Sequence, residues 1–137
     1  MPFDLAESFL LAAESQLGAR LPESYRNAML RANGGELKAA DDSWQQYPIA
    51  DTSDRKRLSR SANHVLKETE VCCRWSRFPL DAVAIAGNGG GDHLVFIKRG
   101  GTFERSVFVW SHETGALEKV ANDFAELEAL SQETPSK

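Results

Sequence analysis

Cysteine is scarce in this sequence, and no apolar run approaches the roughly 20 residues that a membrane-spanning helix needs. The only two cysteines, Cys72 and Cys73, are adjacent, a spacing that suits neither a disulfide framework nor a zinc site. We expect both thiols to be reduced and at least one to pack in the core. Residues 1–14 carry Asp4 and Glu7 and lack a basic segment with a cleavage site, so we expect no secretory signal and a cytoplasmic location.

Positive charge is concentrated in one segment. The formal net charge is −4, yet residues 55–77 hold seven basic and two acidic side chains, which leaves −9 for the rest of the chain. An acidic body disfavours general nucleic-acid binding and is compatible with a basic protein partner. The length of 137 residues fits one hydrophobic core, and we expect a single domain over residues 1–130 with a flexible C-terminal tail over 131–137.

Helical spacing dominates the N-terminal part of the chain. An apolar stripe predicts a first helix over about residues 5–17, with Asp4 as its N-terminal cap and Gly18 at its C-terminal end. A second helix is expected from Pro22, because proline suits a first helical turn. The Asn-Gly-Gly sequence at residues 33–35 should close it.

The next segment is harder to assign. We expect residues 36–53 to form an irregular loop with one or two edge strands. We then expect Asp54 to cap a third helix, which continues to residues 72–73. One face of this helix would form a basic stripe, for which a solvated face is favoured over a dedicated anion site; the stripe comprises Lys56, Arg60, Lys67 and Arg74.

Strand spacing replaces helical spacing after residue 78. Short runs rich in β-branched and aromatic residues, bounded by glycine, asparagine or aspartate, predict strands at 82–86, 93–97, 107–110 and 116–120. The connections are too short for crossover helices, so an antiparallel meander is the simplest arrangement. A final helix should begin after Asn122 or Asp123.

Several short motifs along the chain resemble the SUKH superfamily, which includes the fungal Smi/Knr cell-wall-synthesis regulators. In the first half these are Leu17-Gly18, Leu21-Pro22, Tyr25 and Asn33-Gly34-Gly35. In the second half they are Phe78-Pro79, Ile85-Ala86, Gly91-Asp92, Val109-Trp110 with His112-Glu113, and Asp123-Phe124. Each motif is short, but their order spans about residues 5–130. The segment between Gly35 and Phe78 departs most from the family pattern.

The resemblance implies an α+β fold with a central, mostly antiparallel β-sheet flanked by helices. In bacteria it further implies a non-enzymatic immunity protein that occludes a cognate polymorphic toxin, often a nuclease or deaminase. The alternative is a Smi/Knr-like regulatory or scaffold adaptor without a toxin. Partner choice would then vary in the segment that departs from the family.

The sequence gives less support to an enzyme or a nucleic-acid-binding protein than to a protein-binding domain. The glycine-rich residues 87–92 lack the Lys-Ser/Thr of a phosphate-binding loop and precede a strand, so a hairpin connection is favoured. Asp92, His93, His112 and Glu113 could form a metal or acid–base site, but no spacing requires it. Trp75 and Phe78 beside the basic segment make stacking on nucleic acid conceivable, which the acidic remainder opposes. We expect no catalytic residue, cofactor, metal, nucleic acid or membrane contact.

A protein partner of basic character, the toxin, remains the favoured ligand. Its interface should use acidic or aromatic residues outside the core, although the loop aromatics could equally pack onto it. The candidate protein-binding residues are Asp41, Asp42, Trp44, Tyr47, Asp92 and Glu113.

Overall fold

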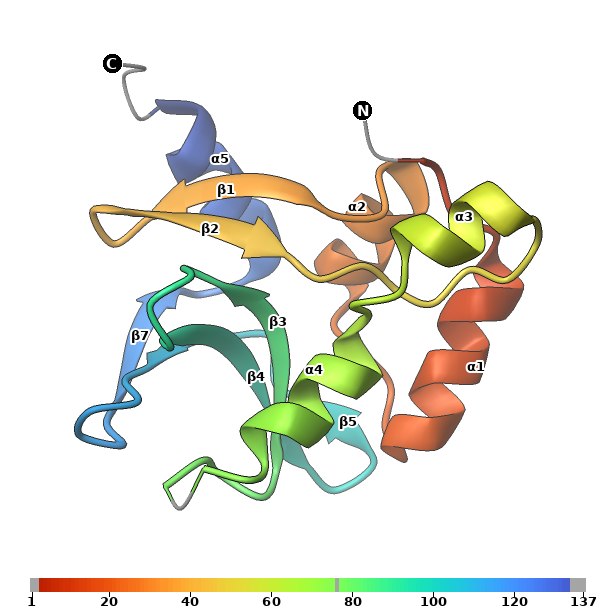
Figure 1. Cartoon of the computed structure of the whole chain (residues 1–137). Coiled ribbons are helices and arrows are strands. Elements are labelled where there is room, and N and C mark those ends of the chain that lie inside the picture. Colours follow the sequence, from red (N-terminus) through yellow and green to blue (C-terminus); the bar gives the residue numbers. More distant parts are fainter. Residues whose placement is uncertain (1–2, 76, 134–137) are drawn as a thin grey trace.

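The computed structural model describes residues 3–75 and 77–133 as five helices around one curled sheet (Figure 1). The helices are α1 (Glu7–Leu17), α2 (Glu23–Arg31), α3 (Arg55–Arg60), α4 (Val65–Cys72) and α5 (Phe124–Glu133). The strands are β1 (Gly35–Ala39), β2 (Asp42–Gln46), β3 (Ala82–Gly87), β4 (His93–Arg99), β5 (Thr102–Phe103), β6 (Val107–Trp110) and β7 (Leu117–Ala121). Among the described residues, no helix is long and apolar enough to cross a membrane.

The sheet has the strand order β1-β2-β3-β4-β6-β7, with β5 paired to β4 outside this path. Every pair of neighbouring strands is antiparallel, as short hairpin connections require. β3 is buried along its whole length, because α4 packs on one face and the main core lies against the other. The expected α+β fold with a central antiparallel sheet and flanking helices is therefore confirmed.

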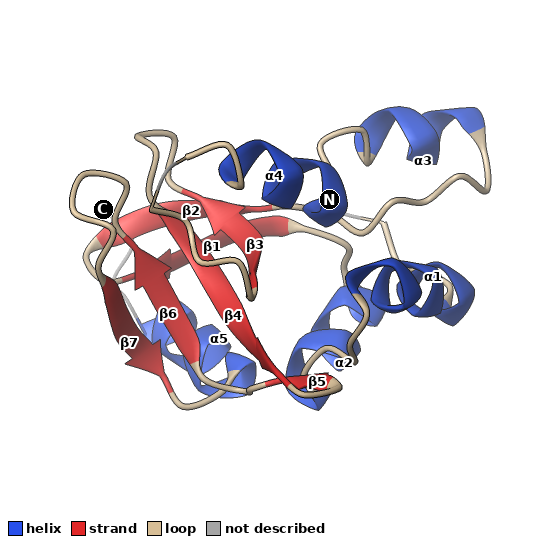
Figure 2. Ribbon diagram, turned by 90° about the horizontal axis from the view of Figure 1, so that it is seen from below, coloured by secondary structure: helices blue, strands red, loops and turns tan. Residues whose placement is uncertain are grey.

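The sheet separates two apolar clusters (Figure 2). The larger lies beneath α1, α2 and α5, where Tyr25 packs edge-on against Phe96 and Phe124. The smaller lies toward α4 and includes Cys72, Phe78 and Trp110. Cys72 is buried, which confirms the expected packing role, and burial raises the pKa of its thiol to about 12.

The motifs of the first half hold α1 and α2 together. Gly18 ends α1 with φ 75°, a left-handed conformation that favours glycine. The buried Glu14 carboxylate accepts hydrogen bonds from the Leu21 N–H at 2.7 Å and from Arg26 Nε at 3.0 Å. Because both charges of this ion pair lie in the interior, Glu14 depends on Arg26 for compensation, while Arg26 also pairs with Glu7 and Glu23.

Two expectations for the helices are wrong. Asp4 does not cap α1, since no side chain caps this helix and Asp4 instead pairs with Arg57. The single helix expected after Asp54 is broken into α3 and α4. Asp54 does cap α3, but the chain stops being helical after Arg60, and His64 begins α4 by accepting a hydrogen bond from the Lys67 N–H.

Residues 36–53 contain most of the β1–β2 hairpin, so the expected strands are present, but only β1 is an edge strand because β2 lies between β1 and β3. Its two turn residues, Ala40 and Asp41, have φ of 50° and 60°, as a two-residue hairpin turn of this hand demands. Glycine or asparagine would signal such a turn in the sequence, and Ala-Asp does not.

The C-terminal helix is longer than expected. Asp123 caps it, since its carboxylate accepts from the Glu126 N–H at 2.8 Å. The helix continues to Glu133, three residues into the stretch expected to be a tail, and the Ser131 hydroxyl accepts a hydrogen bond from the Lys38 N–H of β1. Residues 134–137 of the expected tail lie outside the described residues.

Candidate protein-binding surface

Three connections between strands meet at one end of the sheet. Strand register requires this: Gln45 of β2 pairs with Gly87 at the end of β3, and His93 at the start of β4 pairs with Trp110 at the end of β6. The β1–β2 turn and the connections β3–β4 and β6–β7 therefore lie on the same side, seen at the left of Figure 1. We call residues 40–42, 88–92 and 111–116 the loop end.

The β1–β2 turn is tied to the next connection by one side chain. Asp42 Oδ2 accepts a hydrogen bond from Asn88 Nδ2 at 2.9 Å. The Asn88 side-chain oxygen in turn accepts from the N–H groups of Gly90 and Asp92, at 2.8 and 3.2 Å. Asn88 thus folds the glycine-rich connection onto itself and holds it beside the turn. The expected hairpin connection at residues 87–92 is confirmed.

An aspartate–histidine pair joins the second connection to the third. Asp92 Oδ1 accepts from the backbone N–H of His112 at 3.0 Å and lies 2.7 Å from His112 Nδ1. A Cβ on Gly91 would come within 2.9 Å of the His112 ring, so glycine is needed for this approach as well as for its φ of 108°. Burial raises the pKa of Asp92, but hydrogen bonds from His112 and the nearby imidazoles outweigh it, so the pKa lies below its ordinary value.

The connection that precedes β3 borders the loop end. Arg77 Nη1 donates to the Glu113 carbonyl at 3.0 Å, and the indole N–H of Trp110 donates to the Arg77 carbonyl at 3.1 Å. Trp75 stands edge-on to the His112 ring, with centroids 5.3 Å apart. These contacts could not be predicted from the sequence, because the two residues of each contact are about 35 positions apart.

The candidate residues divide into two groups. Asp41, Asp42, Asp92 and Glu113 all lie at the loop end, and Asp41, Asp42 and Glu113 are exposed. Their three carboxylates form no ion pair within the described part of the chain. The surface therefore offers unneutralised negative charge.

The aromatic candidates are less accessible. Trp44 is only 2% exposed, and its indole N–H donates to the Ala39 carbonyl, so this residue belongs to the core and its assignment to the interface was wrong. Its position opposite Leu37 on the inward face of the hairpin explains the burial. Tyr47 is partly buried beside the His93 ring. Phe78, considered for stacking on nucleic acid, is buried against Trp110.

The model of the SMI1/KNR4 family (SUKH-1) matches residues 5–129. The chain belongs to this family. No curated protein matches the chain in a sequence search. In this SUKH-1 domain the loop end joins two motifs of the family resemblance, Gly91-Asp92 and His112-Glu113, to a β1–β2 turn from the segment that departs from the family pattern.

The side chains of Asp92, His93 and His112 contact one another or the backbone. Within residues 3–75 and 77–133, no three histidine, cysteine, aspartate or glutamate side chains converge as metal ligands would. His93 Nδ1 lies 2.9 Å from the Gly91 carbonyl, and burial lowers the pKa of this imidazole. His112 and Asp92 satisfy each other. The contacts of Asp92, His93 and His112 thus hold the β3–β4 and β6–β7 connections in place.

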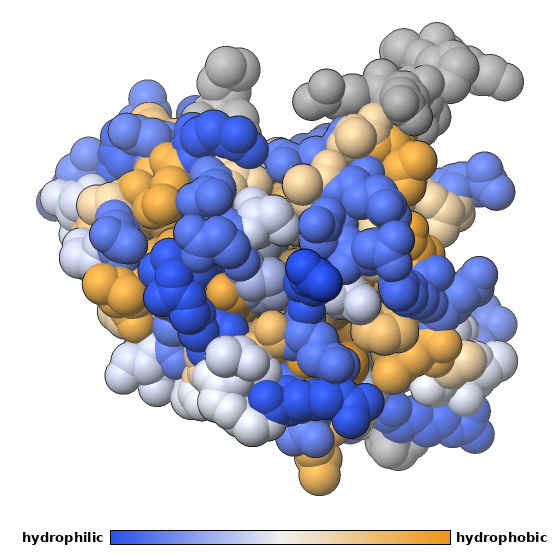
Figure 3. Space-filling model, turned by 180° about the vertical axis from the view of Figure 1, so that it is seen from behind, coloured by the Kyte–Doolittle hydropathy of each residue, from blue (hydrophilic) through white to orange (hydrophobic). Residues whose placement is uncertain are grey.

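The face behind the view of Figure 1 is polar and mixed. Seen from behind, hydrophobic residues appear as separate areas between hydrophilic ones (Figure 3). Monomeric proteins commonly carry such scattered apolar residues, which do not by themselves mark an interface.

Proposed function

We propose that this domain is a non-enzymatic immunity protein that binds a cognate toxin of basic character, a nuclease or deaminase, and blocks access to its active site. The observation that carries the proposal is the pair of exposed carboxylates of Asp41 and Asp42, which make no ion pair within the described residues, at the loop end of a SUKH-1 fold. Nucleases bind phosphate and so present basic clefts, which an acidic surface complements.

The loop end contains residues that hold its connections together and other residues that are free to contact a partner. Asp92 and His112 fix two connections from inside the family motifs, whereas Asp41 and Asp42 lie on the hairpin between Gly35 and Phe78, where we expect the family to vary most. A shared frame with a variable turn suits a family whose members each recognise a different partner. Specificity for one toxin would then depend on the β1–β2 turn.

A double variant tests the proposal. Changing Asp41 and Asp42 to lysine replaces two favourable charges by two repulsive ones on an exposed turn. The change also removes the hydrogen bond from Asn88 to Asp42, so the stability of the variant is measured by urea denaturation alongside binding. The toxin is the product of the neighbouring gene, if that product is a large protein with a variable C-terminal domain. We expect slower association and loss of protection in cells that express this toxin.

The matched control makes the same change of charge elsewhere. Asp81 and Glu104 are exposed at the far end of β4, where their backbones bond Lys98 and Ile97. Asp81→Lys with Glu104→Lys should leave binding and protection close to those of the wild type. If the Asp41 and Asp42 variant folds, binds normally and protects fully, the turn is not the contact surface. If the wild type neither binds nor protects, the Smi/Knr-like adaptor role replaces the immunity role.

A further inference from the structure

A hollow of about 360 Å³ lies at the base of the β1–β2 hairpin, at the opposite end of the hairpin from Asp41. One side is formed by Gly34, Gly35 and Gln45, and the other by the segment that includes α3, with Arg57, Arg60 and Asn63; Phe3 also contributes to the wall. The hollow is open to solvent and is separate from the loop end.

The Asn-Gly-Gly motif shapes the hairpin side of this hollow. Asn33 holds the backbone of Ile49 at both polar groups, donating to its carbonyl at 2.8 Å and accepting from its N–H at 2.7 Å. Gly34 and Gly35 have φ of 118° and 105°, and neither carries a side chain that would fill the hollow. The motif thus fixes the wall through Asn33 and leaves its surface bare at the glycines.

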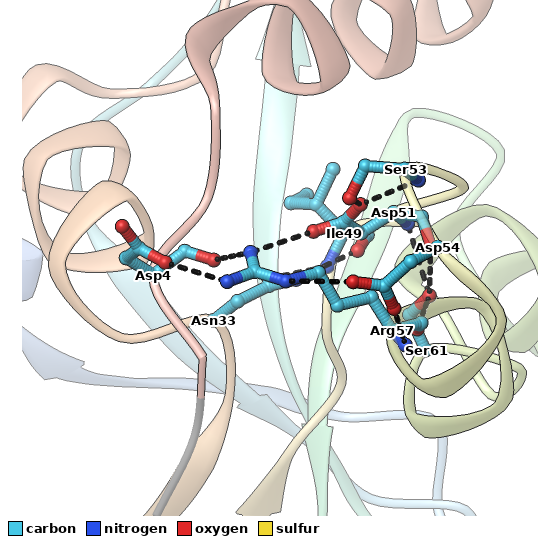
Figure 4. A network of polar contacts seen from close by, with 8 residues as sticks. All are labelled: Asp4, Asn33, Ile49, Asp51, Ser53, Asp54, Arg57 and Ser61. Carbon is cyan, nitrogen blue, oxygen red and sulfur yellow. Dashed lines mark hydrogen bonds and ion pairs between the residues drawn. The ribbon is translucent and has the colours of Figure 1, made fainter.

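Carboxylates already neutralise one of the two arginines of the hollow (Figure 4). Arg57 bonds Asp4 at 3.1 Å and Asp51 at 3.3 Å, and it lies 3.7 Å from Asp54. Asp51 is held by Ser53 as well, whose hydroxyl donates to it at 2.6 Å. This network fixes α3 against the N-terminal segment, so the wall that carries Arg60 is well anchored.

Arg60 has no such partner. Within the described ranges the Arg60 side chain makes no ion pair or hydrogen bond. Its guanidinium lies 5.3 Å from the centroid of the Phe3 ring. Lys56 and Arg57 lie at 5.8 and 4.6 Å from the same ring. Three cations around one aromatic face, two of them without a carboxylate, form a positive edge to the hollow.

We propose that the hollow binds an acidic peptide segment, with a glutamate or aspartate side chain on Arg60 and the peptide backbone along Gly34, Gly35 and Gln45. An arginine held against an aromatic ring is well placed to take a planar carboxylate through two parallel hydrogen bonds. The exposed Gln45 side chain already donates one N–H to the Gly35 carbonyl at 3.4 Å, and its amide oxygen and second N–H can pair with a peptide backbone.

The walls favour a peptide over a nucleic acid. Glu36 and Asp51 also line the hollow, and a phosphate backbone would meet both carboxylates. Glu36 is bonded by the Ser43 hydroxyl at 2.8 Å, further along the hairpin, which leaves Arg60 as the main charge for one localised carboxylate. The proposal does not depend on the immunity role, since it concerns another surface and another charge.

Fluorescence anisotropy with short labelled peptides tests this site. One probe contains a single glutamate among glycine and serine residues, and the other has glutamine in place of that glutamate. At about 0.05 M salt, we expect the glutamate peptide to bind, and the glutamine peptide to bind at least about tenfold more weakly. Amide shifts in NMR spectra should concentrate at residues 34–36 and 60–63.

Variants on α3 separate a defined site from diffuse attraction. Arg60→Glu and Arg60→Gln should each weaken the glutamate peptide by about tenfold or more. Arg55→Glu is the control, because Arg55 is exposed on the same helix and does not line the hollow; it should change the affinity by less than about threefold. Equal losses in Arg55→Glu and Arg60→Glu, absence of binding, or displacement of the peptide by a short oligonucleotide at lower concentration would overturn the proposal.

Discussion

The buried ion pair between Glu14 and Arg26 is the residue-scale contact on which α1 and α2 most depend. Arg26 is 4% exposed and Glu14 8%, so neither charge is hydrated by bulk water. The arginine bonds the carboxylate through Nε and Nη2, and the Leu21 N–H bonds it as well. Arg26 also lies within 3.5 Å of Glu7 and 4.0 Å of Glu23, but Glu14 pairs with no cation except Arg26 among the described residues. Loss of Arg26 would therefore leave the Glu14 charge buried without a cation.

Arg26→Ala should therefore destabilise the fold by about 3 to 5 kcal/mol, measured by urea denaturation. Arg31→Ala is the matched control, because Arg31 pairs with Glu128 at the surface with its own side chain 67% exposed. Exposed pairs contribute about 0 to 1 kcal/mol, so this variant should stay close to the wild type. Similar losses in both variants would show that the buried pair has no special role.

Tyr25 gives a contrasting case at the same scale. Its ring packs against Phe96 and Phe124 and is fully buried, while its hydroxyl has no hydrogen-bond partner among the described residues. A buried hydroxyl without a partner costs free energy, so removing it relieves that cost. Tyr25→Phe should retain the stability of the wild type or gain about 1 kcal/mol in thermal or urea denaturation. A loss of more than about 1.5 kcal/mol would show that the hydroxyl is bonded in solution.

At the scale of elements, apolar spacing predicted most helices and strands but not the break between α3 and α4. The apolar stripe expected for one long helix is continuous in sequence. In the structure the helix ends at Arg60, and the next residue, Ser61, accepts a hydrogen bond from the Asp51 N–H at 2.9 Å. That contact depends on a residue ten positions earlier, so no helical periodicity reveals it. The strands of the β1–β2 hairpin were expected within residues 36–53, but their bounds could not be predicted, because Ala40 and Asp41 lack the usual sequence signal of a two-residue turn.

His64, the cap of α4, gives this break a dependence on pH. Its Nδ1 accepts from the Lys67 N–H at 3.2 Å, which only the neutral ring can do. Burial, and then the charge of Lys67, lower the pKa of His64 below its ordinary value of 6.5. Because the folded pKa is the lower one, the cap is fully stabilising above pH 6.5 and is lost as the pH falls through the folded pKa.

His64→Ala should accordingly destabilise the protein by about 0.5 to 2 kcal/mol at about pH 8. The difference between wild type and variant should shrink as the pH falls toward about 5. Urea denaturation of both proteins across this range measures it, and taking the difference removes the contribution of His93, which is common to both. A difference that stays constant with pH would mean that His64 does not cap through its ring nitrogen.

The whole molecule brings together residues whose proximity depends on the complete sheet. Composition predicted an acidic body, and hairpin spacing placed Asp92 and Glu113 near strand ends. Their convergence with Asp42 required the register that sets Gln45 opposite Gly87 and His93 opposite Trp110. The sequence likewise could not show that Asp41 is exposed while Trp44 is buried, because this depends on which side chains of the hairpin face the core.

Ionic strength provides the last prediction, which concerns the approach of the whole domain to a basic toxin. Electrostatic attraction accelerates encounter more than it sets final affinity, and salt screens it with a Debye length that falls from about 10 Å at 0.1 M to about 3 Å at 1 M. Association of the wild type should slow by about tenfold or more between about 0.05 and 0.5 M salt, while dissociation changes less. Stopped-flow mixing measures both rates.

The two charge variants distinguish the local field of the loop end from net charge. Each replaces two acidic residues by lysine and so takes the formal net charge from −4 to zero. If the loop end guides the encounter, the Asp41 and Asp42 variant should show a shallow salt dependence, whereas the Asp81 and Glu104 variant should keep most of the wild-type slope. Local charges dominate because contributions beyond a Debye length are largely screened. Equal slopes in the two variants would instead assign the attraction to net charge and remove the kinetic reason for placing the interface at the loop end.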